Sequence, residues 1–123
     1  MAKDDIPDPS ASKPNPLHPA YSVSNIQTKI RVLDGSKVTY SSWVTLFRLH
    51  LLAYKVLDHI TGAPPPIATS PDLPCWQELD ALVLQWIYST VSDELLNRIL
   101  APNTIAYTAW SKLEKIFLSN KKA

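Results

Sequence analysis

Glycine is scarce in this chain of 123 residues, which contains only Gly35 and Gly62 against 11 prolines. Phosphate-binding loops and dinucleotide-binding turns depend on closely spaced glycines, which let backbone N–H groups approach the ligand. Two isolated glycines cannot form either motif. The same scarcity disfavours tight β-hairpins, whose commonest turns need glycine. The composition therefore argues against these nucleotide-binding motifs and against a sheet built from hairpins.

Cysteine is rarer still, because Cys75 is the only one. One cysteine excludes an internal disulfide and a cysteine-based zinc site within the chain. The three histidines, His18, His50 and His59, show no His-x-x-x-His spacing, so no helix face gathers a pair of zinc ligands. We therefore expect no metal ion and no other cofactor.

Net charge and long apolar runs are also lacking. Twelve basic and 11 acidic residues give a net charge of +1, which provides no strong field toward nucleic acid or an anionic membrane. No apolar run approaches the ~20 residues of a membrane span, and the first residues lack the apolar stretch of a secretory signal. We expect no membrane partner and a cytoplasmic location.

Apolar side chains nevertheless make up 46% of the sequence and charged ones 19%, which is typical of one soluble globular domain. Residues 1–23 are rich in proline and serine and poor in large apolar side chains. They are therefore predicted to form a disordered leader. The helical domain is predicted to span residues 24–122.

This domain is predicted to begin with a short extended segment. Apolar and charged residues alternate over residues 29–32, and Asp34-Gly35 is a turn signal. The segment would form half of a small hairpin with residues 37–39. It would need to pack against the helices, because two strands alone are only marginally stable.

Helical periodicity dominates the rest of the chain, where apolar residues recur at i, i+3, i+4 and i+7. The pattern predicts five helical segments, at about residues 41–54, 56–60, 74–90, 92–100 and 104–122. Ser41 or Ser42 is expected to cap the first helix, and Ser92 the fourth. Gly62 and later Pro102 are expected to stop the helices before them. The predicted fold class is all-α, a compact bundle of four to five helices.

The apolar faces of these helices are expected to form a single core. The predicted core residues are Trp43, Phe47, Leu51, Ile60, Trp76, Leu79, Val83, Trp86, Ile87, Leu96, Trp110, Leu113 and Phe117. Leu46, His50 and Tyr54 are assigned to the inward face of the first helix. A smaller set falls off the main faces and is expected to stay exposed for a partner, namely Leu84, Tyr88, Tyr107 and Leu118.

Catalytic combinations of residues are few. His50 lies on an apolar helix face and is expected to be a hydrogen-bonded core histidine. His59 precedes a helix stop and is expected to cap a helix end. Cys75 with either histidine is a formal nucleophile–base combination, but nothing in the local sequence supports it. The helical carboxylates, such as Asp80, suit capping and helix-dipole roles. We therefore expect no enzyme activity and no small-molecule substrate.

Five sequence marks occur in a specific order. They are Leu-Asp-Gly … Tyr-Ser-Ser-Trp (Leu33–Trp43), His-Ile-x-Gly (His59–Gly62), Trp-x-x-Leu-Asp-Ala-Leu-Val (Trp76–Val83), the run Gln85–Leu96, and Ala-Trp-x-x-Leu-x-x-x-Phe (Ala109–Phe117). In this order they resemble the N-terminal Gag region of plant copia-type retrotransposons. The resemblance covers residues 24–122.

The resemblance implies a capsid-type fold shaped like the N-terminal lobe, a structural role in virus-like particles, and no catalytic residues. It implies other Gag copies as partners, through weak self-association. RNA binding would be weak, because the family's Cys-x-x-Cys zinc knuckle does not occur before the last residue, Ala123, and a truncated element is therefore expected. The alternatives are a domesticated adaptor that binds host proteins in a groove between helices, or a weak RNA-binding protein.

Overall fold

The computed structural model of this protein describes residues 18–122, with the side chains of residues 18–118. Within this part of the chain the α-helices are α1 (Tyr40–Ala53), α2 (Leu73–Ser89), α3 (Asp93–Ile99) and α4 (Ala106–Lys122). These same residues contain no strand, only an isolated parallel bridge between Leu33 and Val91. The predicted all-α fold class is confirmed.

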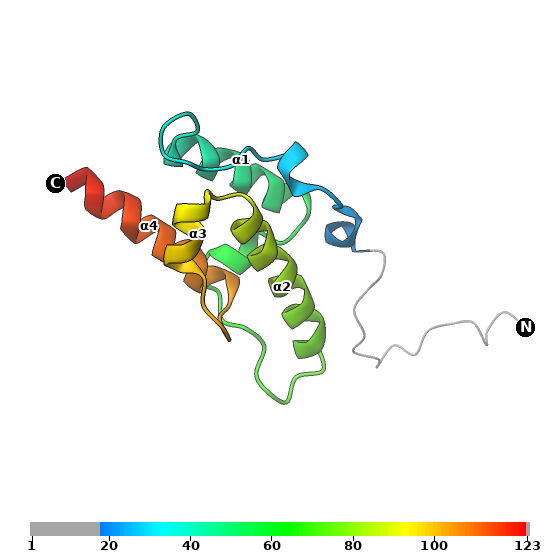
Figure 1. Cartoon of the computed structure of the whole chain (residues 1–123). Helices are drawn as coiled ribbons and strands as arrows, with labels where there is room; N and C mark the ends of the chain where they lie inside the picture. The colour runs from blue at the N-terminus through cyan, green and yellow to red at the C-terminus, as the bar shows by residue number, and fades with distance from the viewer. Residues whose placement is uncertain (1–17, 123) are drawn as a thin grey trace, which may run out of the picture.

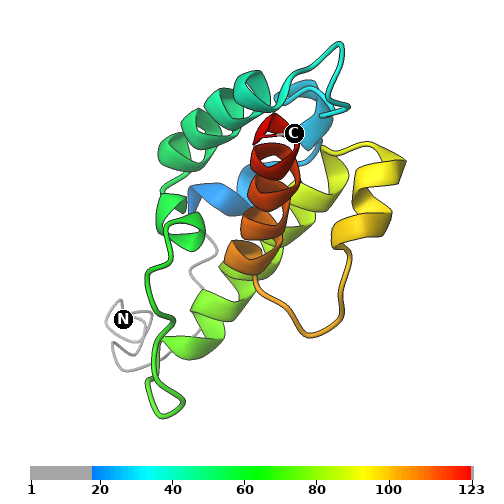
Figure 2. The same ribbon diagram turned by 90° about the vertical axis from the view of Figure 1, so that its left-hand side faces the viewer.

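Helix α4 lies between α1 on one side and α2 and α3 on the other in Figure 2, and Figure 1 shows its C-terminal end projecting beyond them. It packs against α2, α3 and the 3₁₀ helix η4 (Leu57–Ile60), and α1 lies along its other side. Two further 3₁₀ helices, η2 (Pro19–Ser22) and η3 (Ile26–Thr28), precede α1, and η3 contacts α2. Each of the other helical elements in the described part of the chain therefore contacts α2 or α4.

The ends of the helices follow from local polar side chains. Thr39 caps α1, because its side-chain oxygen accepts a hydrogen bond from the Ser42 N–H at 3.2 Å. The predicted cap at Ser41 or Ser42 is therefore wrong, since threonine offers the same kind of oxygen earlier in the chain. Ser92 caps α3 as predicted and accepts from the Leu95 N–H at 3.3 Å.

The stop predicted at Gly62 is confirmed by its backbone. Gly62 follows η4 with φ of +87°, a conformation that costs little for glycine and more for other residues. The Tyr107 ring packs over it, so an added Cβ would lie 3.3 Å from that ring. Any side chain at this position would strain the turn and push Tyr107 away.

The N-terminal boundary of the domain differs from the prediction. Residues 1–17 of the predicted leader lie outside the described residues, but residues 18–23 fold onto the helices. Ala20 is fully buried in the core, and the Tyr21 hydroxyl donates to Glu78 on α2 at 3.0 Å. The sequence hides this contact because one buried alanine among prolines and serines leaves no apolar pattern.

The predicted hairpin with residues 37–39 does not form. Leu33 instead pairs with the loop between α2 and α3: its N–H donates to the Thr90 carbonyl at 2.7 Å, and its carbonyl accepts from the Ser92 N–H at 2.8 Å. Asp34 then closes a turn with its own carboxylate, which accepts two backbone N–H groups from the residues that follow it. A side-chain turn and a distant partner thus replace the local strand pair.

A cluster of aromatic rings joins α1 to α4. The Trp43 ring stacks on Trp110 with 5.2 Å between centroids and lies 4.8 Å from Phe47. Its indole N–H donates to the Thr90 hydroxyl oxygen at 3.1 Å, just after α2. Trp43 is fully buried, so one side chain holds three segments of the fold together.

Most of the predicted core residues are buried, but Trp76, Leu96 and Phe117 are only partly so. Trp76 lies over the ring of His59, and Phe117 stacks on Tyr40. Periodicity places these residues on the correct side of their helices. It does not reveal that each lies where the core meets the surface.

His50 is a polar side chain in an apolar setting. It is 7% exposed and packs against Tyr54 and Trp86, with its ring edge-on to Trp86. Its Nε2 atom has no hydrogen-bond partner, so the prediction of a hydrogen-bonded core histidine is wrong at this nitrogen. Burial, with a smaller contribution from the charge of Lys29, lowers the pKa of His50 below its ordinary value.

We predict that Trp86→Ala lowers the free energy of unfolding by ~3–5 kcal/mol, the range for truncating a large buried aromatic side chain. Trp86 is 3% exposed. Urea denaturation measures the change. Ile67→Ala, at a position 72% exposed, is the control and should change stability by less than ~0.5 kcal/mol. If the two variants unfolded at the same midpoint as the wild type, the burial assigned to α2 would be wrong.

A second prediction concerns pH. Burial makes His50 bind a proton less readily in the folded protein than in the unfolded chain, where histidine binds a proton near pH ~6.5. The unfolded state therefore binds more protons below that pH, and the free energy of unfolding should fall as pH drops from ~7.5 to ~5.5. His50→Leu should flatten this dependence. Denaturation of both proteins at each pH tests it, and two parallel curves would contradict the assignment.

Candidate functional site

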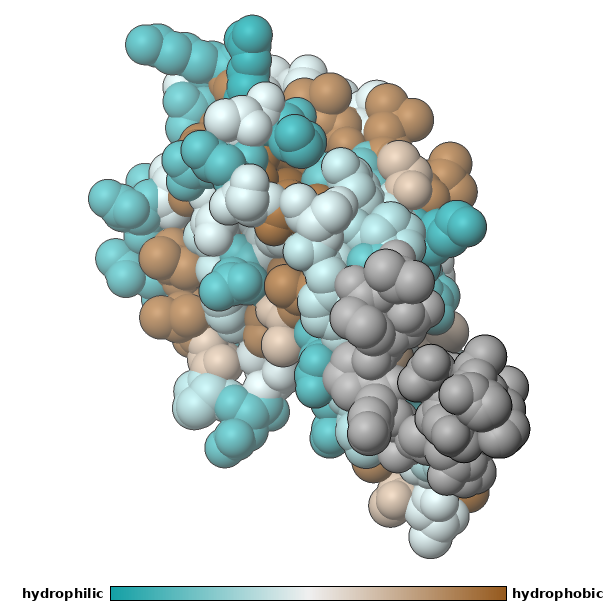
Figure 3. Space-filling view, turned by 90° about the vertical axis from the view of Figure 1, so that its right-hand side faces the viewer, coloured by the Kyte–Doolittle hydropathy of each residue, from teal (hydrophilic) through white to brown (hydrophobic). Residues whose placement is uncertain are grey.

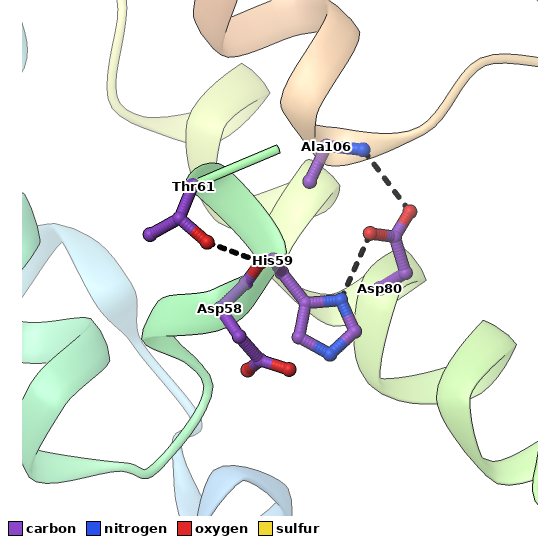
Figure 4. Close-up of polar contacts among 5 residues, drawn as sticks. All are labelled: Asp58, His59, Thr61, Asp80 and Ala106. Carbon is purple, nitrogen blue, oxygen red and sulfur yellow. Dashed lines mark hydrogen bonds and ion pairs between the residues drawn. The ribbon is translucent and has the colours of Figure 1, made fainter. Parts of the chain in front are cut away.

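A buried polar contact joins three elements of the fold (Figure 4). Asp80 on α2 is 4% exposed, and one of its carboxylate oxygens accepts a hydrogen bond from His59 Nδ1 of η4 at 3.0 Å. The other carboxylate oxygen accepts from the Ala106 N–H at 3.0 Å. The Thr61 hydroxyl, drawn in the same view, donates to the backbone carbonyl of Asp58 and closes the end of η4.

Asp80 thus caps the N-terminus of α4, although it belongs to a different helix. First-turn N–H groups lack partners within their own helix, and a negative charge there suits the helix dipole. The predicted capping role of Asp80 is confirmed, although the helix that it caps is not its own. The predicted role of His59 is wrong, because its ring bonds to a carboxylate instead of capping a helix end.

The sequence does contain a signal for this contact. Asp80 lies at the spacing of Trp76, Leu79 and Val83, and therefore on the apolar face of α2. A buried carboxylate is costly unless it is hydrogen-bonded. A charged residue at an inward position therefore predicts a partner from another segment, although the pattern does not say which one.

Histidine paired with aspartate is also two thirds of a hydrolytic triad, which further needs a nucleophile bonded to the histidine. Cys75 and His59 line one small pocket of about 270 Å³. The described part of the chain shows no hydrogen bond between the Cys75 thiol and the imidazole, and the Trp76 ring covers one face of His59 at 5.0 Å. The geometry is that of a structural contact between helices.

A large apolar groove lies between α1 and α4. Its volume is about 760 Å³, and its apolar lining consists of Tyr40, Val44, Trp110, Phe117 and Leu118. The floor is part of the aromatic cluster, because Trp110 stacks on Trp43 beneath it. The groove is therefore a depression that lies directly on the core.

The groove continues along α1 into a second hollow of about 310 Å³, lined by Leu49, Leu52 and Leu57. Leu49 and Leu52 are 59% and 61% exposed. On the face shown in Figure 3, apolar residues gather at the upper right edge, on the side where α1 runs. Contiguous apolar surface of this kind marks an interaction site in many proteins. We call the two hollows together the α1 groove.

Two charged residues of opposite sign line the α1 groove, Arg48 on α1 and Glu114 on α4. The residues described by the structure show no ion pair between them. Burial, followed by the charge of Glu114, raises the pKa of Tyr40 to about 12. Tyr40 is therefore neutral at physiological pH, and its ring stacks on Phe117 at 4.7 Å between centroids.

The exposed apolar residues are only partly those expected from the sequence. Tyr107 and Leu118 are exposed as predicted, but Leu84 and Tyr88 are half-buried and pack against the core. Leu46, which was assigned to the inward face, is 38% exposed. Helix α1 has leucines around most of its circumference, so periodicity alone does not separate its inner face from its outer one.

Comparison of the chain with protein-family models, with curated proteins and with solved structures found no match. The resemblance to Gag therefore stays a prediction. Within residues 18–122, no group of three or more histidine, cysteine, aspartate or glutamate side chains is arranged to hold a metal ion. In the same range, no helix has the length and apolar character needed to cross a membrane.

We predict that Asp80→Ala lowers the free energy of unfolding by ~2–4 kcal/mol, because it leaves the Ala106 N–H and the His59 ring nitrogen buried without a partner. Asp80→Asn should cost less, since the amide can still accept from Ala106 and donate to the other tautomer of His59. Urea denaturation measures both. Asp72→Ala, at an exposed carboxylate that caps nothing, is the matched control; a loss as large as that of Asp80→Ala would contradict the capping role.

Proposed function

We propose that this chain is a structural, non-enzymatic, Gag-like module of a copia-type retrotransposon that associates weakly with copies of itself. The observation that carries the proposal is the α1 groove, an apolar depression flanked by exposed leucines on a helix that also supplies the core. A face of this kind favours a protein partner over a small polar substrate.

The packing adds support, because the sequence marks that resemble Gag contact one another. Trp43 in the first mark stacks on Trp110 in the last, and His59 in the second bonds to Asp80 in the third. These four residues are far apart in the sequence, and their two contacts hold the helices of one domain together.

The size of the exposed patch favours weak association. The most exposed large apolar residues of the groove are Leu49, Leu52 and Leu118, whereas most of the largest aromatic side chains are buried in the core. Three exposed leucines form a small apolar area compared with the ~1,200 Å² of total buried surface that is typical of a stable specific interface. A particle needs at least two different contacts per subunit, so this surface alone accounts for pairs and not for shells.

The test is sedimentation velocity over a concentration series. The wild type should show a concentration-dependent shift toward dimer at high concentration. The variant carrying Leu49→Asp and Leu52→Asp should stay monomeric, because it buries two charges in the contact. Leu100→Asp, at a position 57% exposed outside the groove, is the matched control and should associate like the wild type.

A wild type that remained monomeric at every concentration would refute self-association. RNA binding that persisted at ~0.15 M salt, where weak phosphate contacts fade, would instead favour the RNA-binding alternative.

A further inference from the structure

We propose that the α1 groove holds a second copy of this chain in one specific two-fold arrangement. Helix α1 of each copy lies over α4 of the other, and Arg48 of each copy faces Glu114 of the second copy. This inference rests on the proposed self-association and specifies its geometry. The inference adds to the proposed self-association the two charged residues that determine the orientation of the copies.

Two simple two-fold arrangements bring the banks of one groove over the banks of another. One bank is α1, which carries Arg48, Leu49 and Leu52, and the other bank is formed by α4 and η4, which carry Glu114 and Leu57. A pair of identical surfaces closes on itself by a two-fold axis. An axis along the groove places each bank over the opposite bank of the second copy. An axis across the groove places each bank over its own counterpart.

The charges decide between these two axes. With an axis across the groove at the level of these residues, Arg48 approaches Arg48 of the second copy and Glu114 approaches Glu114, so both contacts are repulsive. With the axis along the groove, each arginine approaches a glutamate, and the symmetry provides two opposite-charge pairs. Like charges brought together at an interface cost far more than rim pairs gain, so the axis along the groove is favoured.

The apolar residues agree with this axis. It places the exposed Leu49 and Leu52 of one copy over the bank that contains the half-buried Leu57 of the other. It also leaves Tyr40 and Phe117, which stack on each other, at the far end of the contact. The near-neutral chain, with a net charge of +1, adds no general repulsion between copies.

Charge reversal tests the arrangement. Arg48→Glu leaves a groove with acidic side chains only, and Glu114→Arg leaves a groove with basic side chains only. Each variant alone should dimerise at least about tenfold more weakly than the wild type at low salt, because both cross-pairs become repulsive. An equimolar mixture of the two variants should dimerise about as well as the wild type, since every pair across the interface is again of opposite sign.

The single variants report on the choice of axis, and the mixture shows whether the charges act between chains. A charge effect confined to one chain cannot be repaired by adding a different chain, whereas a contact between chains can. Sedimentation velocity of each variant and of the mixture gives the dimer fraction, and urea denaturation confirms that each variant is folded. Arg98→Glu, an exposed reversal on α3 outside the groove, is the control and should leave dimerisation within about twofold of the wild type.

The outcomes separate the two proposals. Weak dimerisation of both single variants together with recovery in the mixture supports the arrangement, because with the axis across the groove neither variant would have more like-charge pairs than the wild type. A wild type that dimerises while Arg48→Glu and Glu114→Arg dimerise equally well overturns it but leaves self-association standing. Two weak variants whose mixture stays weak also overturn it. A wild type that does not dimerise at all removes both proposals.

Discussion

The position of the central helix depends on one buried carboxylate. Asp80 holds η4 through His59 and caps the first turn of α4 through the Ala106 N–H. Helix α4 packs against α2, α3 and η4 and also forms one bank of the α1 groove. A contact that is more than nine-tenths buried therefore helps to place one wall of a surface groove. Interior polar groups that bond to two other segments commonly specify one arrangement among several that apolar packing alone would allow.

The apolar residues of α1 form two sets, a buried aromatic cluster and a row of exposed leucines. Trp43, Phe47 and Trp110 form an interlocked cluster that fixes α1 against α4. The leucines on the outer side of α1 touch little of it. Because the same helix supplies both sets, a partner on the outer face would bind a rigid element, and little conformational entropy would be lost there on binding.

How far the sequence predicts this structure depends on the range of each interaction. The helices were predictable because their period, caps and stops are local, as Ser92 and Gly62 illustrate. The partners of Leu33 and Asp80 were not, because each lies more than twenty residues away and no local pattern encodes distance. The α1 groove was missed for another reason. From the sequence, Leu49 and Leu52 could equally be core residues. Only the packed structure shows that they lie on the solvent-exposed side of the helix.

The bridge between Leu33 and the loop after α2 has a consequence for the order in which the chain can fold. Its hydrogen bonds span more than fifty residues, as do those of Tyr21 to Glu78, and such long closures slow folding relative to a bundle with only neighbouring contacts. During synthesis the N-terminal segment leaves the ribosome first but has no partner until α2 and its loop have followed. Its apolar residues therefore stay exposed until then, and the contact between α2 and α4 forms only when α4, which is made after α2, reaches the carboxylate that caps it.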